Sequence, residues 1–175
     1  VYSTIELIDS VSNAVNNGSG KIMHEMSTNG AVFNPGNLNE TPQFATLIWE
    51  VFKWTGDKEF LRKYYPTVEA GLNWLLEEND EDDNLIADGY GMMEIHGLES
   101  EMIDVAAYTY KAFMDAAEMA DVIKKHTQSI GASTQEIKIH LIDASTTILP
   151  GMSDYIVSRT CERLEALGIE IMTDA

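Results

Sequence analysis

Apolar residues recur at three- and four-residue spacing between Tyr2 and Lys125, and this spacing predicts a series of amphipathic helices. Thr41 is expected to cap the second helix, because Pro42 then takes the first helical position, where a missing N–H group costs nothing. The predicted helices run from Tyr2 to Val15, from Thr41 to the turn at Thr55, through Phe60 to Tyr64, from Pro66 to the acidic run at Glu77, and from about Glu99 to Lys125.

Two glycine-rich segments interrupt these helices. Gly20 to Asn39 is also rich in Asn and Ser, and Asn84 to Gly97 holds three glycines. This composition favours loops over helices, and nothing in it predicts a strand. Loops of this length are often functional, so both segments are candidates for a site.

The pattern changes after His126. Residues 127–135 are polar, as a linker is, and 137–142 alternate apolar and polar side chains as a strand does, with Asp143 closing it. A helix is predicted over 153–167 and a second strand over 169–172. The order predicts a parallel βαβ unit with a right-handed crossover. We therefore expect a mainly α chain with a helical segment at 1–126, a linker at 127–135 and a βαβ unit at 136–175.

Composition restricts the function classes. The 175 residues carry 11 basic and 29 acidic side chains, a formal net charge of -18, which argues against nucleic acids and anionic membranes as partners. The single cysteine, Cys161, cannot form an internal disulfide, and no apolar run approaches the ~20 residues of a membrane span. These features favour a cytoplasmic location.

Neither loop contains a known metal motif. His24 and Glu25 are adjacent, but Thr28 stands where a zinc protease would have its second histidine. The acidic run at Asp80 to Asn84 lacks the glycine and glutamate of a calcium-binding loop, so it is interpreted as a solvated helix end. No metal ligand is predicted.

Carboxylates also surround the second loop. Glu94, Glu99, Glu101 and Asp104 lie around a glycine-rich stretch that leads into an apolar helix. In one interpretation different environments keep one carboxyl as an acid and another ionised. In the other interpretation they cap the following helix at its positive end, which suits Glu99 and Glu101 better than Glu94.

Five motifs in order resemble the α/α-barrel glycoside hydrolases of the glycogen-debranching, amylo-glucosidase and glucoamylase-like group. They are Gly20–Gly30 (GKIMHEMSTNG), Asn39–Phe44 (NETPQF), Trp54–Asp57 (WTGD), Tyr65–Pro66 with Trp74–Leu75, and Gly91–Leu98 (GMMEIHGL) leading into Glu101–Val105 (EMIDV). The resemblance covers about residues 1 to 125. It implies a partial α/α toroid of helical hairpins whose loops at one end bind a sugar.

The same resemblance implies roles for individual residues. Glu94 is the candidate general acid of a two-carboxylate glycosidase. The residues expected to bind the sugar are His24, Glu25, Glu40 and His96. Trp49 or Trp54 is expected to belong to the core. The partner carboxylate of the family is expected in later hairpins that this chain does not have, so the segment is expected to be incomplete.

The C-terminal segment resembles the nucleotide-binding part of FAD-containing NADH dehydrogenases. The motifs are Lys138–Ala144 (KIHLIDA), Ile148–Met152 (ILPGM) and Leu164–Ile171 (LEALGIEI). The resemblance implies that Asp143 accepts a hydrogen bond from the ribose of NAD. The glycine-rich phosphate loop that precedes such a strand is missing, so no bound cofactor is expected.

Three hypotheses follow. The chain is a glycoside hydrolase-like segment that acts on or binds α-linked glucosides or oligosaccharides, a nucleotide-binding oxidoreductase fragment, or a composite chain with no catalytic activity. An incomplete toroid leaves apolar helix faces uncovered, so self-association is also expected.

Overall fold

The computed structural model describes most of the chain. The described residues are 1–82, 84–91, 95, 97–98, 100–129, 140–143, 153–166 and 170–173. The elements are α1 (Tyr2–Val15), β1 (Glu25–Met26), β2 (Val32–Asn34), α2 (Glu40–Thr55), α3 (Lys58–Asn79), α4 (Ile103–Ser129), β3 (His140–Asp143), α5 (Asp154–Ala166) and β4 (Glu170–Thr173). The mainly α fold class is confirmed.

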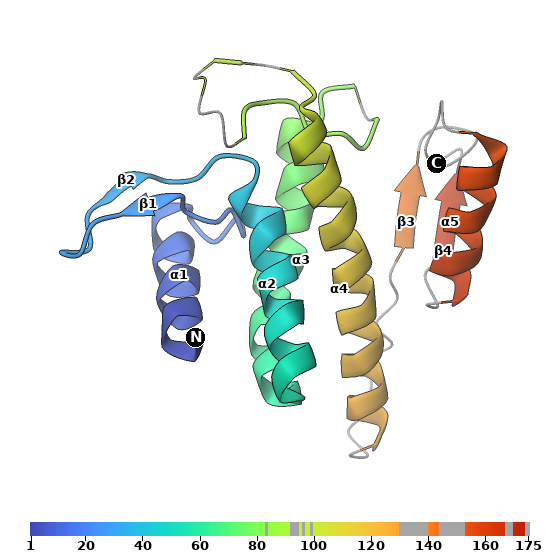
Figure 1. Ribbon diagram of the computed structural model, residues 1–175, viewed down its shortest axis with the longest axis horizontal. Helices are drawn as coiled ribbons and strands as arrows, with labels where there is room; N and C mark the ends of the chain where they lie inside the picture. The colour runs from blue at the N-terminus through green and yellow to red at the C-terminus, as the bar shows by residue number, and fades with distance from the viewer. Residues whose placement is uncertain are drawn as a thin grey trace.

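Four helices form a helical body in which consecutive helices from α2 to α4 run in opposite directions (Figure 1). The apolar core lies where α2, α3 and α4 face one another, around fully buried side chains such as Ile48, Leu61 and Met119. α1 lies against α3, because the rings of Tyr2 and Phe60 meet edge to face at 4.9 Å between centroids. The predicted helical hairpins are therefore present, and their membership of a partial toroid stays a prediction.

The turn between α2 and α3 follows the signals in the sequence. Gly56 ends α2 in the left-handed conformation, with φ of 67°. The Asp57 side chain then caps α3 by accepting a hydrogen bond from the Phe60 N–H at 3.0 Å. Trp49 is buried as expected, whereas the expectation of a core position is wrong for Trp54, which is 88% exposed next to this turn.

The predicted break at Pro66 is wrong. A single helix, α3, runs through this residue, although proline removes one helical hydrogen bond. The buried face of α3 continues on both sides of Pro66, with Tyr64 before it and Val68 and Leu72 after it. Burial of this continuous face outweighs the lost hydrogen bond, and Pro66 itself lies on the exposed side.

Two further boundaries differ from the predictions. α2 begins at Glu40, and the Thr41 hydroxyl accepts a hydrogen bond from the Ile22 N–H at 3.0 Å instead of capping the helix. α4 continues through the first residues of the predicted linker to Ser129, where the Thr127 hydroxyl donates to the Ile123 carbonyl. Both differences come from contacts that local composition does not reveal.

The first loop contains a short hairpin that was not predicted. β1 and β2 pair antiparallel, with Glu25 opposite Asn34 and Met26 opposite Val32. This hairpin projects sideways from the helical body beside the C-terminal end of α1 (Figure 1).

The C-terminal βαβ unit is present as predicted. β3 and β4 pair in parallel, with His140 opposite Glu170 and Asp143 opposite Thr173, and α5 connects them. Asp143 is the last residue of β3. Among the described residues, no helix combines the length and the apolar character that a membrane crossing requires.

Candidate functional site at the loop end

The loops of the helical body gather at one end. α1 and α3 finish there, α2 and α4 begin there, and the connecting segments are 16–39 and 80–102 (Figure 1). We call this the loop end. The opposite end carries the turn at Gly56 and the last turn of α4, and we call it the turn end.

The centre of the loop end is a contact between His24 and Glu40. The Nδ1 of His24 lies 2.5 Å from Oε1 of Glu40, and the side chains are 27% and 12% exposed. Because an ionised carboxylate only accepts hydrogen bonds, Nδ1 carries the proton, and in the neutral ring Nε2 is then an acceptor. Glu40 is also in the first turn of α2, where the helix dipole favours a negative charge.

Three asparagines close to Glu40 in the sequence form hydrogen bonds at the loop end. The second carboxylate oxygen of Glu40 accepts from the Asn37 N–H at 2.8 Å. The Asn34 amide donates to Oδ1 of Asn37 at 3.2 Å, and the Asn39 amide donates to Asp104 at 2.8 Å. Among the described residues, Asn37 Nδ2 and Asn39 Oδ1 are buried without a hydrogen-bond partner, as is Nδ1 of His126 at the turn end.

Two glycines allow the loops to pack this closely. A Cβ on Gly36, whose φ is +128°, would lie 2.1 Å from the Ile22 carbonyl oxygen. A Cβ on Gly91 would lie 2.5 Å from Nδ2 of Asn39. The second loop is therefore seated directly on the residue that precedes Glu40, and the Leu38 N–H donates to the Tyr90 carbonyl at 3.3 Å.

Lys21 lies near the carboxylates of the loop end. Nζ of Lys21 is 5.1 Å from the centroid of the Trp74 ring, which is a cation–π distance. Burial lowers the pKa of Lys21, and the charges of Glu40 and Glu78 oppose that shift. Lys21 thus partly balances the negative charge of the loop end.

The structure brings some of the predicted site residues together. His24 and Glu40 are in contact, and Glu25 is exposed on the neighbouring strand β1. Glu94 and His96 lie outside the described residues, so their predicted roles stay predictions. Asp143 belongs to the separate βαβ unit and shares no element with the loop end.

Sequence reasoning did not single out Lys21 or the asparagines at 34, 37 and 39. The available signal was three asparagines in six positions immediately before a helix that starts with Glu40. Such a run predicts a polar turn, since Asn is common in turns. The burial of Asn37 and Asn39 follows only from the packing of the second loop against this run.

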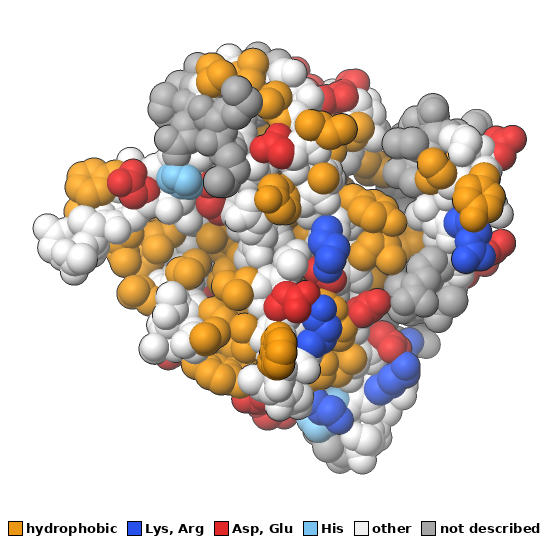
Figure 2. All heavy atoms as spheres, viewed as in Figure 1, with side chains coloured by type: hydrophobic (Ala, Val, Ile, Leu, Met, Phe, Trp, Pro, Cys, Tyr) orange, Lys and Arg blue, Asp and Glu red, His pale blue; other side chains and the backbone are white. Residues whose placement is uncertain are grey.

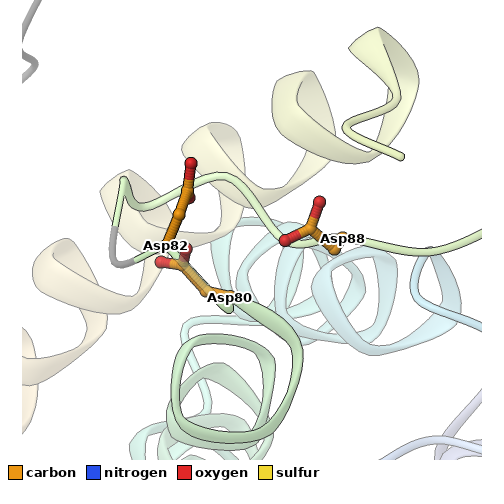
Figure 3. Close-up of side chains that lie close together, drawn as sticks. All are labelled: Asp80, Asp82 and Asp88. Carbon is orange, nitrogen blue, oxygen red and sulfur yellow. The ribbon is translucent and has the colours of Figure 1, made fainter. Parts of the chain in front are cut away.

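The acidic run after α3 forms a cluster of its own (Figure 3). Asp80, Asp82 and Asp88 each place a carboxylate oxygen within 4.8 Å of the others. Asp80 accepts backbone hydrogen bonds from Asn84 at 3.0 Å and Leu85 at 2.8 Å. These carboxylates therefore shape the turn that leaves α3. Glu101 accepts a hydrogen bond from the Asn84 amide at 2.6 Å, and its role as a helix cap stays a prediction.

Comparison with known proteins leaves the family open. No protein-family model matches the chain, and no solved structure gives a significant match. The functional argument therefore depends on the chemistry of the loop end.

Proposed function

We propose that residues 1–126 form a glycoside hydrolase-like segment that binds α-linked glucosides or oligosaccharides at the loop end. The observation that supports this proposal best is the contact between His24 and Glu40. It is partly exposed, its carboxylate accepts a hydrogen bond from the Asn37 backbone N–H, and it lies at the end where the loops gather.

The chemistry of the loop end suits a sugar. Each sugar hydroxyl donates one hydrogen bond and accepts others, and it needs carboxylate, imidazole and amide groups at fixed positions. Glu40 holds the imidazole of His24 in one tautomer, and the Asn37 N–H holds Glu40. An uncharged ligand also fits a chain of net charge -18 better than an anion, which the acidic surface repels.

Cleavage of a glycosidic bond needs an acid as well as a second carboxylate. Under this proposal Glu94 is the acid that protonates the leaving oxygen. The segment that carries Glu94 starts at Gly91, and Gly91 packs against the side chain of Asn39. Asn39 directly precedes Glu40 in the sequence. Binding and cleavage are separate claims, because the second carboxylate has not been assigned to a residue of this chain.

The test is a titration with maltotriose, followed by calorimetry and by NMR shifts of the histidine rings. Glu40→Gln and His24→Ala are expected to weaken binding at least tenfold, whereas His126→Ala at the turn end should leave it unchanged. Release of glucose that Glu94→Gln abolishes would establish catalysis. A wild-type chain that binds no sugar contradicts the proposal and favours a composite chain without activity.

A second candidate is nucleotide binding by the βαβ unit. The parallel register of β3 and β4 supports it, because Asp143 then stands at the carboxyl end of its strand. It ranks second because the sequence has no glycine-rich phosphate loop before residue 140. Enhanced NADH fluorescence that Asp143→Ala removes would favour it over the sugar site.

A further inference from the structure

The hairpin β1–β2 contains an irregularity that presents an aromatic ring. Glu25 pairs with Asn34 and Met26 pairs with Val32, so Phe33 has no residue opposite it. Such a bulge re-aims a side chain, and bulges are frequent beside functional sites. The Phe33 side chain is 69% exposed, so its ring is accessible to a ligand beside the hairpin.

The bulge is attached to the proposed sugar site on both strands. The His24 N–H donates to the Asn34 carbonyl at 3.1 Å, so the residue after Phe33 is bonded to the residue that contacts Glu40. Asn34 also accepts from the Gly36 N–H at 3.0 Å and donates to Asn37. The backbone next to Phe33 is therefore connected by hydrogen bonds to the residue that contacts Glu40.

The exposed face of the hairpin combines polar and apolar side chains. Figure 2 shows an apolar, an acidic and a histidine side chain in a row over the β1–β2 hairpin. Glu25 on β1 and Phe33 on β2 are both exposed. A row of this kind matches a pyranose chain, in which each ring has apolar C–H faces and a polar edge of hydroxyl groups.

We infer that Phe33 is the stacking platform for a second sugar ring, when the first ring is bound at His24 and Glu40. The inference rests on the proposed function and names the oligosaccharide, rather than a single sugar, as its ligand. The C–H face of the ring lies on the negative face of the aromatic ring, while Glu25 accepts hydrogen bonds from the hydroxyl groups at its edge.

The experiment compares dissociation constants for glucose, maltose and maltotriose. In the wild type the second ring is expected to tighten binding by roughly threefold to tenfold, the range of an aromatic contact. Phe33→Ala should remove this gain and leave the glucose constant unchanged, and Phe33→Tyr should keep the gain. The matched control is Trp54→Ala, because Trp54 is an exposed aromatic residue at the turn end, and this variant should change none of the three constants.

The outcomes separate the two proposals. If the wild type binds none of the three sugars, the proposed function fails and the platform fails with it. If glucose binds but maltose binds no more tightly, or if Phe33→Ala keeps the gain, only the platform is overturned. Thermal unfolding of Phe33→Ala is expected to match the wild type, because the ring is exposed and leaves no cavity.

Discussion

The two ends of the helical body each hold a histidine beside a glutamate, and their environments differ. At the loop end His24 and Glu40 are 2.5 Å apart, and the Glu40 side chain is 12% exposed. At the turn end His126 and Glu59 are 3.4 Å apart, and the Glu59 side chain is 72% exposed. The contrast lies in the glutamates, because His126 is 18% exposed against 27% for His24, and a contact to an exposed carboxylate contributes little to stability.

The different exposure of the two glutamates arises from the segments that lie next to each contact. The loop end has two long segments, and one of them supplies the Asn37 N–H that fixes the second oxygen of Glu40. At the turn end the described residues form a tight turn between α2 and α3 and the last turn of α4, and Glu59 stays exposed there. Three comparisons follow, each between one residue from the loop end and one from the turn end, and each measures this contrast.

The largest effect is expected from alanine at a glycine of each end. Gly36→Ala should lower the free energy of unfolding by about 3 kcal/mol or more, because its Cβ would meet the Ile22 carbonyl oxygen at 2.1 Å and its φ is positive. Gly56→Ala at the turn end should cost only about 1 kcal/mol, since it has positive φ but open space around the Cβ. Urea unfolding followed by tryptophan fluorescence measures both. Equal losses would contradict the close packing of the loop end.

An intermediate effect is expected from the two glutamates. Glu40→Gln should lower the free energy of unfolding by about 1 to 2 kcal/mol, because one of its two hydrogen bonds would meet the wrong group in a mostly buried position. Glu59→Gln should stay within about 0.5 kcal/mol, as is usual for an exposed side chain. The same unfolding assay applies. A loss at Glu59 as large as that at Glu40 would remove the distinction between the two contacts.

The sequence predicts the parts of this fold that depend on local pattern. The helical stripes, the cap at Asp57 and the parallel βαβ unit are all visible in spacing and turn residues. The continuation of α3 through Pro66 and the exposure of Trp54 are not visible in the sequence pattern. Each depends on which neighbouring helix covers that face of the helix. Local patterns cannot report such neighbours.

In the candidate site, too, the sequence predicts some residues, and the contacts between them depend on the fold. The motifs at 20–30 and 39–44 selected His24 and Glu40, but only the fold brings these side chains together. The buried amides of Asn37 and Asn39, and the bulge at Phe33, depend on the register of the hairpin and on the position of Gly91. Each of these is a contact between segments that periodicity does not connect.

The smallest effect is expected in the titration of two lysines that stack on aromatic rings. Nζ of Lys21 lies 5.1 Å from the Trp74 centroid at the loop end, and Nζ of Lys63 lies 5.0 Å from the Tyr64 centroid near the turn end. Burial lowers the pKa of Lys21 below 10.5, whereas hydrogen bonds to Tyr64 and Glu6 raise that of Lys63. NMR titration of the lysine side-chain signals should therefore give the lower midpoint for Lys21.

The sign of the stability change follows from these shifts. The unfolded chain keeps the Lys21 proton to higher pH than the folded chain, so this lysine makes the protein more stable as pH rises from its folded pKa towards 10.5. Lys63 acts in the opposite direction, and its contribution is lost as pH rises above 10.5. Because the charge of Glu40 raises the pKa of Lys21, Glu40→Gln should lower the Lys21 midpoint further and leave Lys63 unchanged. If Glu40→Gln left the titration midpoint of Lys21 unchanged, the charges of Lys21 and Glu40 would not interact at the loop end.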